Sequence, residues 1–294
     1  MVRLTVLGSG SSGNCAVVST GKTTLLIDAG LSAKQICLRL AEVGLTLEAI
    51  SGILLTHEHL DHTAGLGVLS GKLSLPLYCT ALTQEVLLSG IPFRTPPRWR
   101  IMDSSGRFEI GDLRIECFSV PHDAVDPIGF VIADDESRLG VLSDVGHVTH
   151  LIKERLRHSD SLFIEANYDV RMLEADTKRP WPTKQRISSR HGHLSNDQAA
   201  ELVEEIGHAG LNHVLLGHLS DDCNCPDRAA ERLAESLRRG GAHQAHVACA
   251  HRHRVTPTIQ AGRERPAVVG WTAPATEADA QPCARRQHQQ LSLF

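Results

Sequence analysis

Short runs of apolar residues alternate with turn residues along most of the chain. Three such runs follow one another at the start, over Arg3–Leu7, Cys15–Ser19 and Thr23–Asp28, and each has the length and composition of a β-strand. Apolar residues then recur at helical spacing over Ala33–Val43, which predicts a helix that ends at Gly44. The pattern therefore predicts strands first and a helix after them.

The mixture of strands and helices continues to about Ala250. Ile53–Leu55 has the composition of a buried strand. Further strands are predicted over Leu77–Cys79, Phe108–Ile110, Leu113–Ser119, Ile128–Ala133, Arg138–Ser143, Leu162–Glu165, Val214–Gly217 and Ala245–Cys249. Helices are predicted over Asn196–Ile206, capped by Ser195 or Asn196, and over Asp227–Arg238, with Pro226 near its start. Hairpins followed by strand–helix units indicate a mixed α+β domain.

The pattern changes after Ala250. Residues 251–294 contain four prolines, many Arg, Gln and Ala residues, and little apolar periodicity, which is typical of a disordered segment. We therefore predict a folded domain over residues 1–250 and a disordered basic tail over residues 251–294.

Composition supports a globular protein. Hydrophobic residues make up 41% of the chain and charged residues 22%. The eight cysteines lie mostly singly in apolar runs, as reduced core thiols do, and the close pair Cys223 and Cys225 lacks a second pair for a four-cysteine metal site. No apolar run approaches the roughly 18 residues of a membrane span, and the first residues do not resemble a signal peptide. We predict a cytoplasmic protein with no membrane partner.

The net charge of −4 is unevenly distributed. Residues 251–294 hold six arginines and three acidic residues, so this tail carries +3 and the remaining residues carry −7. Bound divalent ions would add positive charge to the body at the site itself. The net charge therefore does not exclude nucleic acid as a partner.

The densest group of metal-ligand side chains is the segment 57–62, HEHLDH, which directly follows the strand Ile53–Leu55. Histidine and aspartate both bind borderline divalent metals, and two such metals can share a bridging water. Three further candidates each follow an apolar strand directly, at His122, Asp144 and His218. Strand ends on one rim of a domain would bring these side chains together with the turn.

The HEHLDH segment resembles the HxHxDH signature of the metallo-β-lactamase superfamily. The resemblance implies an αββα sandwich, in which two mixed sheets pack face to face with helices outside. It also implies the ligands of two divalent metals: His57, His59 and His122 for the first, Asp61, His62 and His218 for the second, and Asp144 as the bridge. Asp28, in LIDAG, matches an acidic position of the superfamily and is predicted to orient a ligand histidine through its free ring nitrogen; the alternative is an N-cap for the following helix.

A site of this kind makes a hydrolase. A water that bridges two divalent ions becomes hydroxide near neutral pH, Asp61 or Asp144 can hold its proton, and the metals stabilise charge on an ester or phosphoryl oxygen. Imidazole-rich ligation favours Zn²⁺, while the carboxylates also allow Mn²⁺ or Fe²⁺. The ligands alone do not select the bond that is cleaved.

Two segments bear on the substrate. The loop 8–14, GSGSSGN, offers backbone amides and the side chains of Ser11 and Asn14 as a phosphate cradle, although tight turns also need glycine. A basic stretch, predicted as a loop, contains Lys178, Arg179, Lys184, Arg186 and Arg190 beside His191 and His193. It fits a phosphodiester backbone, with His193 placed to donate a proton to the leaving oxygen; a solvated basic loop is the alternative.

The elements GSGSSGN, LIDAG, LLTHEHLDH, EANYD, GHLSN and LGHLS occur in the order found in YycJ/WalJ-type metallo-hydrolases, which the chain resembles over residues 1 to about 250. The resemblance implies a phosphodiesterase that acts on DNA as an exonuclease in repair or replication, with a metal-activated hydroxide as the attacking group. It adds Asn167 and Ser220 to the predicted substrate-binding residues. The CNCP sequence after His218 and the long tail depart from the pattern.

The last five residues, QLSLF, resemble the peptide by which bacterial replication and repair proteins dock on the DNA sliding clamp. Gln290 would be the polar anchor, and Leu291, Leu293 and Phe294 would enter an apolar pocket at the end of a flexible tether. An incidental apolar end is the alternative.

Other functions stay open. A hydrolase of this fold can act on small esters, lactones, thioesters or cyclic phosphodiesters, and activity on duplex DNA against small esters would separate these from a nuclease. A tRNA-processing nuclease is a nearer rival, although no inserted arm for gripping tRNA is obvious. A non-catalytic metal-binding regulatory protein is disfavoured, because a structural site has no use for a second metal and an open water position.

Overall fold

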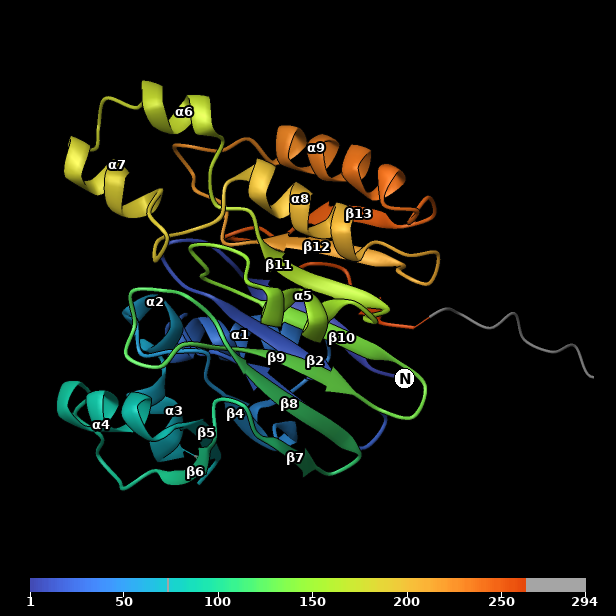
Figure 1. Cartoon of the computed structure of the whole chain (residues 1–294). Coiled ribbons are helices and arrows are strands. Elements are labelled where there is room, and N and C mark those ends of the chain that lie inside the picture. The colour runs from blue at the N-terminus through green and yellow to red at the C-terminus, as the bar shows by residue number, and fades with distance from the viewer. Residues whose placement is uncertain (73, 263–294) are drawn as a thin grey trace, which may run out of the picture. The chain divides into compact units, whose positions relative to one another are not determined.

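The computed structural model of the chain describes residues 1–72 and 74–262. These residues form two mixed β-sheets that face each other, with helices on their outer sides, which confirms the predicted αββα sandwich (Figure 1). One buried cluster joins the sheets, since Leu4 and Val6 of one share it with Ile115 and Phe130 of the other. Alternate side chains of the central strands point into this cluster, as expected for a sandwich.

The first sheet has seven strands. In spatial order they are β14 (Ile259–Gln260), β1 (Arg3–Gly8), β2 (Cys15–Ser19), β3 (Thr24–Ile27), β4 (Gly52–Leu54), β5 (Pro76–Thr80) and β6 (Arg98–Met102). Strands β14 to β3 pair antiparallel, and β3 to β6 pair parallel. The parallel strands therefore end at one rim of the sandwich.

The second sheet also has seven strands. In spatial order they are β13 (His246–Cys249), β12 (His213–Gly217), β11 (Ser161–Glu165), β10 (Arg138–Leu142), β9 (Ile128–Ala133), β8 (Leu113–Ser119) and β7 (Arg107–Ile110). Strands β7 to β10 pair antiparallel, and β10 to β13 pair parallel. Strands β8, β10, β11 and β12 thus all run toward the same end of the sheet.

Helices cover the outer faces of both sheets. They are α1 (Ala33–Glu42), α2 (Leu60–Thr63), α3 (Leu66–Lys72), α4 (Ala81–Gly90), α5 (His150–Leu156), α6 (Val170–Ala175), α7 (Trp181–Ile187), α8 (Asn196–Ile206) and α9 (Pro226–Arg239), with a 3₁₀ turn over Leu47–Ala49. Ser195 forms a capping box with Gln198 at the start of α8. No helix within the described residues is long and apolar enough to cross a membrane.

The predicted strands agree with the observed ones to within a residue at each end. Strand β6 was missed, because three of its five residues are exposed and its burial does not alternate. The basic stretch was predicted as a loop, which is wrong, because it contains α7. This helix begins at the Trp181–Pro182 pair and buries only Lys184, so it leaves no apolar periodicity in the sequence.

The folded domain extends beyond the predicted boundary at residue 250. Strand β14 pairs with β1, the Thr256 amide donates to Val6 O at 3.0 Å, and Ala261 is fully buried. The prediction of disorder is therefore wrong for residues 251–262. Strand β14 has only two residues, so it is too short to produce a periodic pattern.

Candidate metal centre

The predicted ligands lie at the rim where the parallel strands end. The segment 57–62 follows β4, and His122, Asp144 and His218 come after β8, β10 and β12. Asp28, Asp144 and His218 have positive φ angles of 58°, 46° and 53°, and they are the only non-glycine residues with such angles in the part of the chain that the structure describes. This backbone conformation is uncommon outside glycine and concentrates at functional sites. It turns the chain sharply out of the sheet at the strand end.

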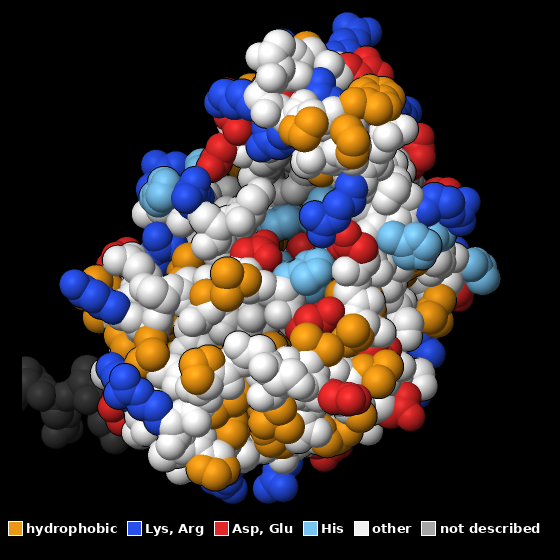
Figure 2. Space-filling view, turned by 90° about the vertical axis from the view of Figure 1, so that its left-hand side faces the viewer, with side chains coloured by type: hydrophobic (Ala, Val, Ile, Leu, Met, Phe, Trp, Pro, Cys, Tyr) orange, Lys and Arg blue, Asp and Glu red, His pale blue; other side chains and the backbone are white. Residues whose placement is uncertain are grey.

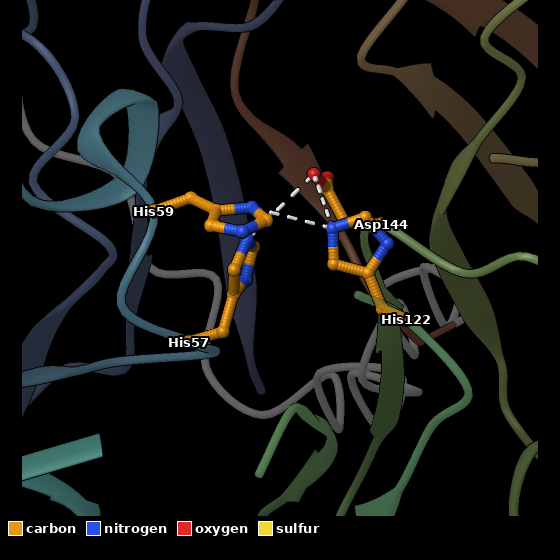
Figure 3. Close-up of side chains that lie close together, drawn as sticks. All are labelled: His57, His59, His122 and Asp144. Atoms are coloured by element: carbon orange, nitrogen blue, oxygen red, sulfur yellow. Dashed lines mark hydrogen bonds and ion pairs between the residues drawn. The ribbon is translucent and has the colours of Figure 1, made fainter. Parts of the chain in front are cut away.

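One group of ligand atoms comes from His57, His59, His122 and Asp144, and these atoms all lie within 4.8 Å of one another. Figure 3 shows the two histidines of the turn facing His122 and Asp144 of the second sheet. His122 Nε2 lies 3.4 Å from His59 Nδ1, and Asp144 Oδ2 lies 3.7 Å from His122 Nε2 and 3.8 Å from His57 Nε2. This is the first ligand group that the resemblance implies.

A second group contains Asp61, His62, Asp144 and His218, again with ligand atoms within 4.8 Å of one another. His218 Nε2 lies 3.2 Å from Asp61 Oδ2, and His62 Nε2 lies 3.4 Å from Asp144 Oδ2. This group corresponds to the second implied set. The buried carboxylate of Asp144 takes part in both groups, as the predicted bridge between two metals would.

The donor atoms fit bound divalent ions. Ligands held tetrahedrally at about 2.1 Å from a metal lie about 3.4 Å from one another, which matches the spacing found here. His57 Nε2 is buried and has no hydrogen-bond partner among the described residues. A buried nitrogen without a partner is costly unless a ligand completes it. Imidazole and carboxylate donors suit Zn²⁺, Mn²⁺ or Fe²⁺.

Carboxylates and a carbonyl behind the ligands hold the histidine rings in place. Asp28 Oδ2 lies 2.8 Å from His62 Nδ1, while the Thr56 amide donates to Asp28 Oδ1 at 2.8 Å. His122 Nδ1 lies 2.9 Å from Gly192 O. Such contacts fix the ring so that its other nitrogen faces the metal. The alternative role of Asp28 as an N-cap is excluded, because Ser32 caps α1.

Sequence reasoning missed Glu165, which completes a third group with Asp144, His193 and His218. Its side chain is 0% exposed. Oε1 lies 2.6 Å from His193 Nδ1 and 3.0 Å from His218 Nδ1, and Oε2 accepts from the backbone amides of Val145 and Leu194. The sequence signal that could have identified Glu165 was the EANYD motif, which begins with this residue. Glu165 ends β11 instead of following it, so it does not match the strand-then-ligand pattern of the other residues.

Electrostatics act differently on the side chains of the centre. Burial lowers the pKa of His62 and His218, but the neighbouring carboxylates raise it, well above the usual value for His62 and to about 10 for His218. Burial and the neighbouring His62 lower the pKa of His57 well below its usual value, so its imidazole is neutral. Burial would raise the pKa of Asp144, but His218 and His62 lower it well below the usual range. Burial would lower the pKa of His193, but Glu165 raises it, which favours the protonated ring.

Three polar residues predicted to bind substrate are instead engaged inside the protein. Asn14 Oδ1 accepts from Ser9 Oγ and from the Gly10 amide, each at 2.9 Å. Asn167 Nδ2 donates to His218 O at 2.8 Å, and Ser220 Oγ accepts from the Cys223 amide at 3.1 Å. These three side chains help to position the loops that carry the predicted ligands, and their role as substrate contacts stays a prediction.

The loop 8–14 is a tight turn and not a preformed phosphate cradle. The Ser9, Gly13 and Asn14 amides donate to the carbonyls of His251, Gly10 and Asp61, so they are not free for a phosphate. Gly13 has a φ of 153°, and a Cβ there would lie 2.7 Å from Gly30 O, which explains the glycine. Ser11, the remaining predicted contact in this loop, is exposed.

The basic residues of α7 and of the loop after it differ in their exposure to solvent. Lys184 is buried and donates to Glu174 O at 2.8 Å, so its ammonium is engaged within the protein, and its role as a substrate contact stays a prediction. A lysine stem can pack in the protein while its ammonium bonds a carbonyl, which composition cannot reveal. Arg186 and Arg190 are exposed; the former pairs with Asp123, and the latter donates to His147 Nε2 at 3.0 Å.

Comparisons with known proteins agree with this geometry. A family model described as a beta-lactamase superfamily domain matches residues 23–218. The chain is 35% identical over 243 residues to exodeoxyribonuclease YycJ of Bacillus anthracis, which covers 82% of this chain and 90% of that protein. It is 36% identical over 238 residues to exodeoxyribonuclease WalJ of Streptococcus pneumoniae, covering 80% and 88%. The solved structure of the metallo-beta-lactamase fold protein YhfI from Bacillus subtilis matches with a TM-score of 0.65 at 17% identity, covering 87% and 98%.

The family model spans most of the chain, and both curated relatives align over nearly their whole length. Their identity lies well above that of the structural match, which shows the fold alone. The chain is therefore a metallo-hydrolase of the β-lactamase superfamily and belongs with the YycJ and WalJ proteins.

Proposed function

We propose that this protein is a DNA exonuclease that hydrolyses phosphodiester bonds with two divalent metal ions, of which Zn²⁺ suits the imidazole-rich ligands best. The observation that carries the proposal is the sharing of Asp144 between two ligand groups, with the His193–Glu165 pair directly beside them. The names of the two relatives, both exodeoxyribonucleases, support DNA as the substrate. A role in DNA repair or replication and a cytoplasmic location remain predictions.

The residues of the centre have different roles in the proposed reaction. When bound, two divalent ions supply an activated water and stabilise charge on a phosphoryl oxygen. Asp61, whose side chain is 24% exposed, is the ligand carboxylate that a substrate approaches and a candidate to hold the proton of the attacking water. Asp144 is buried and holds the two groups together.

His193 is the candidate proton donor for the leaving oxygen. Its side chain is 18% exposed, and its ring centroid lies 5.2 Å from that of His122 and 5.0 Å from that of His218. The ring therefore stands between the two ligand groups. Because Glu165 holds Nδ1, Nε2 is the atom available for proton transfer.

Positive charge lies beside the centre. Figure 2 shows a hollow in which histidine and acidic side chains gather, with Lys and Arg side chains at its edge. Arg186 pairs with Asp123, the residue after the ligand His122. A guanidinium at this place can contact a phosphate next to the scissile bond.

The test is digestion of end-labelled duplex DNA by the metal-loaded protein, beside an Asp61→Ala/His62→Ala control and a parallel assay with bis(4-nitrophenyl) phosphate. We expect stepwise shortening of the DNA that the control lacks. Hydrolysis of the small diester without shortening of DNA would overturn the exonuclease assignment and favour a small-molecule hydrolase of this fold.

We also propose that Gln290, Leu291, Leu293 and Phe294 bind the bacterial DNA sliding clamp. These residues lie outside those that the structure describes, so the proposal rests on the sequence QLSLF alone. Calorimetric titration of a bacterial clamp with the whole protein and with a Leu293→Ala/Phe294→Ala variant tests it. Equal heats for the two proteins, or none for either, would refute clamp binding.

A further inference from the structure

Residues 251–254, with the sequence His-Arg-His-Arg, are held firmly at the rim of the sandwich. The Ser9 amide donates to His251 O at 3.2 Å, and Arg39 Nη1 donates to Arg252 O at 3.0 Å. Arg39 is itself buried and also donates to Leu7 O at 2.7 Å. A buried guanidinium therefore fixes the path of a segment that composition alone assigned to a disordered tail.

This basic rim segment, residues 251–254, lies next to the metal centre. Ser9 Oγ accepts from the His218 amide at 2.8 Å and donates to Asn14 Oδ1 at 2.9 Å. Asn14 Nδ2 in turn lies 3.3 Å from Asp61 Oδ2. Ser9 thus touches the basic rim segment, a predicted metal ligand and the residue that contacts a second ligand.

A cavity of about 150 Å³ opens at this place. Ser9, Leu219, Ser220, Asp221, Asn224 and Arg252 are among the residues that line it. The cavity therefore lies between the loop that follows His218 and the basic rim segment, beside the ligand-bearing rim.

The two arginines of the segment can exchange their present contacts for phosphates. Both are exposed, and Arg252 pairs with Asp221 at 2.8 Å, where the two side chains are 41% and 63% exposed. Such surface pairs contribute little stability and are screened by salt. Arg254 Nη2 contacts His251 Nε2 at 2.7 Å, and within the described residues it forms no ion pair with an acid.

Cations also flank the other side of the loop after His218. Asp222, the neighbour of Asp221, pairs with Lys178 and Arg179, which come from the segment between α6 and α7. The loop therefore separates two sets of cations, one on the α6–α7 side and one in the basic rim segment. Both sets therefore contact the loop that follows the predicted ligand His218.

From these observations we infer that the basic rim segment is a second contact surface for the phosphate backbone of the nucleic-acid substrate, with Arg252 and Arg254 as the cations that bind it. The inference rests on the proposed function. It assigns to the folded domain a binding surface separate from Arg186 and Arg190. The backbone would then be held on both sides of the loop that follows His218.

The experiment measures the affinity of the whole, metal-loaded protein for short fluorescent single-stranded DNA by anisotropy over a series of KCl concentrations. Phosphorothioate linkages keep the DNA intact during the measurement. The Arg252→Ala/Arg254→Ala variant is compared with an Arg114→Ala/Arg239→Ala control. The control arginines also form surface ion pairs, but they lie where β8 begins and α9 ends, away from the ligand-bearing rim.

We expect the Arg252→Ala/Arg254→Ala variant to bind about tenfold more weakly at moderate salt, with a log–log salt slope shallower by about 1.5, because two phosphate contacts are lost. The control should match the unaltered protein, and an Arg252→Lys/Arg254→Lys variant should keep the salt slope, since the charges remain. Equal slopes for the alanine variant and the unaltered protein would overturn the inference.

A separate digestion assay distinguishes failure of this inference from failure of the exonuclease assignment. If the unaltered protein digests DNA while the alanine variant binds normally, the inference fails and the exonuclease assignment stands. If the unaltered protein binds DNA through these arginines without digesting it, the inference stands and the exonuclease assignment fails. Absence of both binding and digestion would refute both.

Discussion

The two sheets contribute to the metal centre in different ways. The first sheet supplies His57, His59, Asp61 and His62 from a single turn after β4. The second sheet supplies one ligand each from three separate strand ends, at His122, Asp144 and His218. Local backbone geometry fixes the spacing within the turn, whereas the other three residues meet only when β8, β10 and β12 adopt the correct register.

Asp144 connects these two contributions. It lies in both ligand groups and in the third group with Glu165 and His193, and it is 2% exposed. The turn therefore supplies most of the candidate ligands, but the second sheet holds the residue that both groups share. Substitutions on the two sides should accordingly have unequal effects.

The largest effect should follow from Asp144→Ala, which removes one ligand from each group. We expect kcat on DNA to fall at least about 1000-fold, because neither metal is then properly held. Steady-state digestion of labelled DNA measures it, and Asp135→Ala, an exposed aspartate on the β9–β10 turn, is the matched control. A near-normal kcat for Asp144→Ala would contradict this difference between the two sheets, because Asp144 would then not be needed to connect the two ligand groups.

His193→Gln should come next. The substitution removes the candidate proton donor but none of the seven predicted ligands, so kcat should fall about 100-fold or more while the bound metal stays. Pairing the kinetics with elemental analysis separates the two effects. The proton-donor role also predicts partial recovery with a substrate whose leaving group needs no proton, such as a nitrophenyl ester; equal loss on both substrates would contradict it.

Asp28→Asn tests the contribution of the first sheet, because Asp28 follows β3 and contacts His62. The amide keeps the shape of the side chain but loses the charge that orients His62, so metal affinity should weaken about 10- to 100-fold. Competition against a fluorescent chelator gives the dissociation constants. Asp112→Asn, which changes an aspartate bonded to Thr20 and Thr23 at the edge of the domain, should leave them unaltered.

Lys184→Met should have the smallest effect and should be structural. Loss of the bond to Glu174 O should lower the free energy of unfolding by about 1 kcal/mol, as expected for one hydrogen bond. The salt dependence of DNA binding should not change, in contrast to Arg190→Ala, which removes an exposed cation. Urea denaturation and anisotropy measure the two properties, and a shallower salt slope for Lys184→Met would instead show that Lys184 contacts DNA.

Most of the sandwich could be predicted from the sequence because its central strands are short apolar runs between turn residues. The turn 57–62 was visible because its ligands are close in sequence, and His122, Asp144 and His218 were visible because each follows a strand. Their convergence needed the pairing of strands far apart in the chain, which the resemblance to a known family supplied.

The residues that escaped prediction share a physical reason. Glu165 lies inside β11, so it resembled a strand residue, and its partners come from distant segments. Lys184 and Asn14 are polar residues whose bonds are internal, and composition cannot separate these from residues that face solvent. Residues 251–262 are fixed by scattered hydrogen bonds to Arg39, Ser9 and Val6, by the short pairing of β14 with β1 and by the burial of Ala261, none of which produces a periodic apolar pattern.

The central claim is that two divalent ions bind where the contributions of the two sheets meet at Asp144. Elemental analysis of the purified protein after titration with Zn²⁺, beside Asp144→Ala, tests it most directly. The account predicts about two tightly held ions per chain in the unaltered protein, as in two-metal sites, and loss of tight binding at both positions in the variant. Two ions retained by Asp144→Ala, or a single ion at saturation in the unaltered protein, would contradict it.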